Sequence, residues 1–187
     1  MFRPPGQSRA MPMVLIFFGA NVDFPRILQT PHTPESYMID NAYPFNQTKA
    51  SSYRFTSIGM TEITKEVVFT HTGYRNIVSM GFGDVSQDGL VDDKANSNNG
   101  DIVKVLGTVV QIIIDFTNRC PDSTIFFTGS TPERSKLYHR ILRTYYHVFG
   151  KDFTINILEI RGNRFIERPF DPEQNIDFRG FLIKRIH

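Results

Sequence analysis

The sequence predicts a single α/β domain of the α+β class, with one mixed, mainly antiparallel sheet and two main helices. Short stretches that alternate apolar and polar residues recur from Tyr53 onward, a pattern typical of half-buried strands. Two longer stretches place apolar residues at helical spacing instead. Three strands come first, then a helix, a strand, a second helix and further strands. A mixed sheet that carries both helices suits that order.

Composition supports a globular domain and excludes several classes of protein. Of the 187 residues, 40% are hydrophobic and 21% are charged, which suits a chain with a sizeable core. A net charge of +2 does not require nucleic acid as a partner. The single cysteine, Cys120, rules out an internal disulfide and favours a cytoplasmic protein. The apolar run 11–20 is too short to span a membrane and lacks a signal-peptide cleavage pattern.

The chain divides into an extension and a domain. Residues 1–37 contain six prolines without sustained periodicity, which predicts a poorly ordered N-terminal extension. Met38 could be the true start, so this extension could lie outside the native protein. Residues 38–187 form the predicted globular domain.

The regular segments give the expected elements. Strands are expected over Tyr53–Ile58, Ile63–His71 and Tyr74–Val85, joined as an antiparallel meander. The acidic, Asn-rich stretch 86–100 has no secondary-structure pattern and is expected to be a loop. The remaining elements are a helix at 101–119, a strand at 124–128, a helix from Pro132 to Phe149 ended by Gly150, and strands at 153–160, 164–169 and 181–186.

Two polar motifs precede the two helices and mark a candidate site. They are Ser97–Asp101 and Gly129–Arg134. Helix amino termini present unpaired backbone N–H groups and a positive dipole, so two neighbouring termini favour an anion. The predicted ligand- or anion-binding residues are Asp84, Ser97, Asn98, Asn99, Gly100, Asp101, Lys104, Ser130, Thr131 and Arg134, with Tyr138 as a candidate catalytic acid.

Arg134 falls on the apolar face of its helix, in the first turn, where the dipole opposes a cation. Such an arginine implies an anionic partner. That partner is either an internal carboxylate, Asp84 or Asp101, or a bound phosphate or carboxylate.

The other motif residues also have structural interpretations. Ser97, Asn98 or Asn99 could cap the first helix, and Gly100 allows a tight turn into it. Alternatively, the same loop could cradle an anion with its backbone N–H groups. Thr131 is a good cap for the second helix, and Lys104 is expected to pair with Asp101 one turn before it.

Other chemistries do not fit the spacing. The histidines and Cys120 show no zinc-ligand spacing, and the aspartates of the acidic loop lack the calcium-loop pattern, so no metal site is predicted. The Gly-x-Ser-x-Gly elbow of hydrolases is absent around Ser130.

Several separated motifs resemble one bacterial family, the domain of unknown function 6934. They are Tyr53-Arg-Phe-Thr-Ser-Ile-Gly, Gly81-Phe-Gly-Asp84, Ser97-Asn-Asn-Gly-Asp101, Gly129-Ser-Thr-x-x-Arg134-x-x-x-Tyr138 and Phe181-Leu-Ile-x-Lys-Arg. The resemblance covers about residues 38–187 and brings no established activity with it.

The order of elements also resembles the core of the GNAT acyltransferases. That resemblance implies a coenzyme A donor, such as acetyl-CoA, at the first helix, and Leu137-Tyr138 is similar to a segment of the next helix. The coenzyme A signature is missing before Val103, and Asp101 stands where it would repel a pyrophosphate.

Two functions follow as hypotheses. The first is a divergent acyl- or group-transfer enzyme in which Arg134 holds a phosphate and Tyr138 acts as general acid. The second is a non-catalytic module that binds a protein partner or a small anionic ligand, with the same residues forming an internal polar network. We favour the second, because the sequence shows no clear pair of base and nucleophile. Whether the protein is an enzyme is left open at this point.

Overall fold

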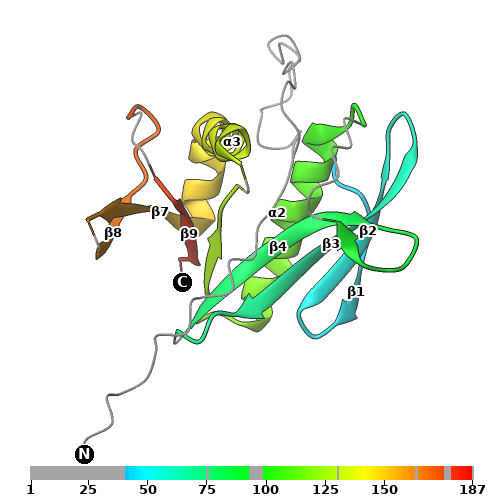
Figure 1. Ribbon diagram of the computed structural model, residues 1–187, viewed down its shortest axis with the longest axis horizontal. Helices are drawn as coiled ribbons and strands as arrows, with labels where there is room; N and C mark the ends of the chain where they lie inside the picture. The colour runs from blue at the N-terminus through cyan, green and yellow to red at the C-terminus, as the bar shows by residue number, and fades with distance from the viewer. Residues whose placement is uncertain are drawn as a thin grey trace, which may run out of the picture.

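The computed structural model describes residues 41–74, 76–92, 99–129, 131–162, 164–174 and 178–186. These residues form one mixed sheet with two long helices, which is the predicted fold class (Figure 1). The predicted N-terminal extension, residues 1–37, lies outside the described residues.

The strands follow the alternating segments of the sequence. They are β1 (Phe45–Lys49), β2 (Ser52–Ile58), β3 (Glu62–His71), β4 (Ile77–Val85), β5 (Val91–Asp92), β6 (Thr124–Phe127), β7 (Phe153–Arg161), β8 (Arg164–Pro169) and β9 (Gly180–Arg185). Their order across the sheet is β1-β2-β3-β4-β6-β9-β7-β8, and the short β5 pairs with the end of β4.

Pairing is antiparallel except at the centre of the sheet. β2, β3 and β4 form the predicted meander, with Phe55 opposite Lys65 and Lys65 opposite Asp84. β4 and β6 are parallel, because α2 crosses over between them. The last strand in sequence, β9, lies between β6 and β7. The C-terminal strand β9 is therefore inserted inside the sheet, next to the central parallel pair of β4 and β6.

Both helices cover the same face of the sheet. α2 (Ile102–Arg119) lies over the half that contains β1–β4, and α3 (Pro132–Asp152) lies over the half that contains β7–β9 (Figure 1). The alternate strand residues that face the helices are buried with them in one hydrophobic core. α2 packs on β3 through Phe116, whose ring stacks on Phe69 at 3.9 Å, and α3 meets β6 through an edge contact of Tyr138 with Phe127.

Several boundaries differ from the sequence prediction. Gly150 does not end the second helix, which continues to Asp152 after a kink at Tyr145. β4 begins at Ile77 rather than Tyr74, because Asn76 adopts a positive φ of 63° just before it. β1 was not predicted, and its polar sequence FNQTK is held by pairing with β2.

Candidate functional site

The amino end of α2 is held by a network around Asp101. Asp101 Oδ2 accepts hydrogen bonds from the hydroxyls of Tyr43, at 2.7 Å, and Ser57, at 2.6 Å. The Tyr43 hydroxyl in turn accepts from the Ile58 N–H at 2.9 Å. Burial, with the hydrogen bond to Asp101 as a second cause, raises the pKa of Tyr43 above its ordinary value. Asp101 therefore faces β2 and Tyr43 as a structural acceptor.

Asn99 extends the same network into the turn between β2 and β3. Its Nδ2 donates to Ser57 Oγ and to the Thr61 carbonyl, both at 2.9 Å, and its Oδ1 accepts from the Thr61 N–H at 2.9 Å. Gly100 turns the chain into α2 with a φ of +80°, as its sequence position predicts. Asn99 is thus a buried tie between the loop and the β2–β3 turn.

Asn99, one of the three predicted caps of α2, does not cap the helix, because its side chain is bonded to Ser57 and Thr61. The N-cap residue is Asp101, and its side chain makes no cap hydrogen bond because it points to Tyr43 and Ser57. Ser97 and Asn98 lie outside the described residues, so their predicted roles stay predictions.

The expected ion pair between Lys104 and Asp101 is not found, although both residues are described. Lys104 Nζ lies instead over the ring of Tyr43, 4.2 Å from its centroid, as a cation–π contact. Lys104 and Asp101 therefore contact the same tyrosine: the lysine contacts the ring of Tyr43, and the carboxylate accepts from its hydroxyl.

Asp84 belongs to a nearly buried ion pair on β3 and β4. Lys65 Nζ lies 2.5 Å from Asp84 Oδ1, and the two side chains are 2% and 15% exposed. They stand opposite each other in the strand register, on the face that the helices cover. Of the two internal carboxylates expected for Arg134, Asp84 thus pairs with Lys65 and Asp101 with two hydroxyls.

The amino end of α3 matches its prediction more closely. Thr131 is the N-cap, and its hydroxyl accepts from the Arg134 N–H at 3.4 Å. A Cβ at Gly129 would lie 2.3 Å from the Ser135 backbone nitrogen, so the turn from β6 into α3 requires glycine. Arg134 is buried, as its place on the apolar face predicted. Ser130 lies outside the described residues.

Tyr138 lies one turn beyond Arg134 and is 6% exposed. Its hydroxyl is buried and has no hydrogen-bond partner. Burial raises the pKa of this hydroxyl far above its ordinary value, and the charge of Arg134 opposes the shift. Tyr138 therefore keeps its proton throughout the physiological pH range.

An apolar cavity of about 70 Å³ lies between the two helices and the sheet. Tyr138 lines it. The other lining residues are Met80, Phe82, Leu106, Val109, Val110, Ile113, Phe127, Ile141, Leu142, Phe149, Phe153 and Ile183. The sequence does not mark this cavity, because each of its lining residues taken alone has the pattern of an ordinary core residue.

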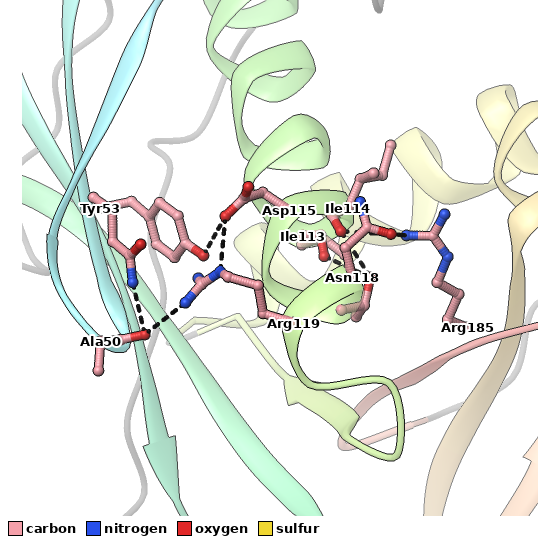
Figure 2. A network of polar contacts seen from close by, with 10 residues as sticks. Ala50, Tyr53, Ile113, Ile114, Asp115, Asn118, Arg119 and Arg185 are labelled. Carbon is pink, nitrogen blue, oxygen red and sulfur yellow. Dashed lines mark hydrogen bonds and ion pairs between the residues drawn. The ribbon is translucent and has the colours of Figure 1, made fainter.

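A second polar network, also missed, fastens the carboxyl end of α2 (Figure 2). The Tyr53 hydroxyl donates to Asp115 Oδ2 at 2.7 Å, and Arg119 contacts both Asp115 and the Ala50 carbonyl. On the other side, Arg185 of β9 donates to the Ile114 carbonyl and to Asn118. This network joins α2 to both halves of the sheet and has the character of a structural anchor.

The predicted site residues therefore belong to two groups. Asp84, Asn99, Gly100, Asp101 and Lys104 are placed by contacts with β2, β3 and Tyr43, whereas Thr131, Arg134 and Tyr138 belong to the start of α3. The described residues contain no group of three His, Cys, Asp or Glu side chains placed to hold a metal ion. Within the same residues, neither helix is long and apolar enough to cross a membrane.

The fold and site define an α+β domain with an apolar cavity under two helices. A family model described as "Family of unknown function (DUF6934)" matches residues 40–186, so the chain belongs to this family, as its motifs indicated. Neither the search of curated proteins nor the search of solved structures found a match. The resemblance to the GNAT acyltransferases is not confirmed.

Proposed function

We propose that this domain is a non-catalytic ligand-binding module whose ligand occupies the cavity between α2 and α3. The observation that carries the proposal is the cavity itself, whose apolar wall is formed by both helices and the sheet and includes the ring of Tyr138.

Two of the residues first expected to bind an anion, Asp101 and Asn99, support the module in this proposal rather than form its site. Asp101, Ser57, Tyr43 and Asn99 satisfy one another and the neighbouring backbone. A carboxylate at the amino end of α2 also repels an anion placed there. Their hydrogen bonds hold α2 against β2, and α2 forms one wall of the cavity.

The cavity suits an apolar ligand because its lining is aliphatic and aromatic. Empty apolar cavities remain dry, and an engineered cavity of about 150 Å³ with a comparable lining binds benzene or xenon. This cavity is about half that size. A cytoplasmic setting belongs to the same proposal and is supported by Cys120, a free thiol.

Xenon tests the proposal, because it fills apolar cavities without needing a hydrogen bond. We expect dissolved xenon to shift the NMR methyl signals of Ile141, Leu142 and Ile183, which line the cavity. Val109→Phe should fill the space and abolish these shifts, with Val109→Leu as a milder variant if the first fails to fold. Unchanged methyl signals in the unaltered protein would overturn the proposal.

A second candidate function is acyl transfer from a coenzyme A-type donor. It is favoured by the placement of Arg134 and Tyr138 one turn apart at the amino end of α3, directly after β6. In this function Arg134 holds a phosphate and Tyr138 returns a proton to the departing thiolate. A calorimetric titration with acetyl-CoA tests it: binding that Arg134→Ala abolishes in a folded protein would support it, and no heat would exclude it.

A further inference from the structure

The edge of the sheet at β8 is a second surface, separate from the cavity. Among the described residues, β8 pairs with β7 on one side only, so the backbone groups on its outer side meet no described strand (Figure 1). An edge strand of this kind can accept an extended segment of another chain as an additional strand. We propose that β8 docks an extended, acidic segment of a partner protein.

The two edge strands of the sheet differ in their regularity. β1, at the other edge, has a register shift between Gln47 and Lys49, and both a bulge and a lysine discourage the addition of a strand. β8 keeps an unbroken register with β7 over all six of its residues, from Arg164 to Pro169. Pro169 has no N–H to donate, so pairing at this edge is limited to the residues before it.

Three arginines lie on one face of the β7–β8 hairpin. Arg161 stands directly opposite Arg164, and Arg168 stands opposite Ile157, a core residue. Strand alternation therefore places all three arginines on the face that bears the helices. Like charges directly opposite each other on neighbouring strands are destabilising, and an anionic partner would relieve that repulsion.

Glu159 holds two of these arginines but does not neutralise the group. Its Oε2 lies 3.1 Å from Arg161 Nε and 3.5 Å from Arg168 Nε. The two arginine side chains are still 57% and 40% exposed, and Arg164 forms no ion pair with a described residue. One carboxylate among three guanidinium groups leaves a positive surface, which favours an acidic partner and disfavours a second copy of the same hairpin.

The spacing of the cations favours an extended segment over a small anion. Arg164 and Arg168 are four residues apart on one strand, which is about 13 Å at the usual rise per residue. One phosphate cannot contact both, whereas acidic side chains four residues apart on an added strand can reach both.

The opposite face of the same hairpin offers an apolar contact. Phe165 and Ile160 stand opposite each other in the register and are 65% and 43% exposed. An added strand directs alternate side chains to the two faces, so a segment with acidic residues on one face and apolar residues on the other fits this edge.

A synthetic segment tests the proposal. The peptide Thr-Glu-Val-Thr-Val-Glu-Thr reads the same in both directions and carries its glutamates four residues apart. It is titrated into the full-length protein by NMR, and the control peptide has lysine in place of both glutamates. We expect saturable binding of the acidic peptide, slower hydrogen exchange at alternate amides of β8, and about tenfold weaker binding of the lysine peptide.

Charge reversal at each edge of the sheet gives a matched pair of variants. Arg164→Glu should weaken the acidic peptide about tenfold, whereas Lys49→Glu on β1 should change its dissociation constant by less than about twofold. Urea denaturation shows whether both variants fold. Absence of saturable binding to the unaltered protein, or equal weakening by the two variants, would overturn the proposal. Tighter binding of a single-stranded oligonucleotide than of the acidic peptide, lost in Arg164→Glu, would also overturn it, because the surface would then serve nucleic acid.

Discussion

The tyrosines under α2 and the tyrosine of α3 are equally buried but differently satisfied. The Tyr43 and Tyr53 hydroxyls each donate to an aspartate of α2 or its N-cap, at 2.7 Å in both cases. The Tyr138 hydroxyl, under α3, has no partner. All three tyrosines are less than 7% exposed, so burial alone does not explain the difference.

The difference between these tyrosines separates residues that support the fold from a residue that lines the proposed binding cavity. Around α2 the polar groups are paired at both ends of the helix, which fixes its position on the sheet. Folded proteins rarely leave a buried polar group unpaired, so an exception invites a functional explanation. The Tyr138 hydroxyl is one such exception among the described residues, and the ring of the same side chain lines an apolar cavity.

The largest expected effect comes from the ion pair beside the α2 network. Replacing Lys65 by Met leaves the Asp84 carboxylate nearly buried without its cation, which should lower the free energy of unfolding by about 3–5 kcal/mol. Urea denaturation measures the change. The double variant Lys65→Met, Asp84→Leu is the control and should recover much of the loss. A loss below 1 kcal/mol in the single variant would show that the pair is not structural.

Next in size is the loss of Asp101. Asp101→Ala removes the acceptor of the Ser57 hydroxyl and one of the two acceptors near the Tyr43 hydroxyl, the other being the Ile58 carbonyl, and we expect a loss of about 1–3 kcal/mol. Asp101→Asn keeps one acceptor oxygen and should lose less. Equal losses in the two variants, measured by urea denaturation, would argue against the acceptor role.

A smaller effect on stability is expected when the pH is lowered, and it acts through His139 on α3. His139 stacks on Phe178, and burial, opposed by a hydrogen bond with the Gln174 backbone, lowers its pKa below the ordinary value of 6.5. The unfolded chain therefore takes up the proton first as pH falls. Stability due to His139 is complete above pH 6.5 and decreases as the pH drops below it.

Thermal unfolding at pH 7.5 and 5.5 checks this prediction, with His139→Phe as the comparison. The difference in melting temperature between the two pH values should be smaller in the variant. An identical difference in both proteins would exclude His139 as the cause.

The smallest effect should come from the exposed pair of Arg143 and Glu173. Their side chains are 52% and 80% exposed, so solvent screens the 3.2 Å contact. Arg143→Gln should change the free energy of unfolding by about 0.5 kcal/mol or less. A loss comparable to that of Lys65→Met would show that solvent exposure does not decide how much these ion pairs contribute to stability.

The sequence was enough to predict the sheet and both helices, because their periodicity is strong. Lys65 alternates with Val67 and Phe69 along β3, and the side that these residues share proves to face the helices. It missed β1, because a strand exposed to solvent needs no alternating pattern. Packing of Val148 and Phe149 in the core carries α3 past Gly150, against the local preference of glycine.

The candidate site was less predictable because it depends on distant contacts. Asp101 is turned inward by Tyr43 and Ser57, which lie 58 and 44 residues away in the sequence. The cavity is assembled from two helices and four strands, so no local pattern marks it. Tyr138 was singled out for its position in a motif, and its lack of a partner became visible only in the folded chain.

The most direct test of the account compares Tyr138→Phe with Tyr43→Phe by urea denaturation without ligand. Tyr43→Phe removes a hydroxyl that serves Asp101 and the Ile58 N–H, so a loss of about 1–3 kcal/mol is expected. Tyr138→Phe removes a hydroxyl without a partner, so the free energy of unfolding should stay the same or rise. A loss for Tyr138→Phe as large as that for Tyr43→Phe would show that the hydroxyl is already satisfied and would contradict the account.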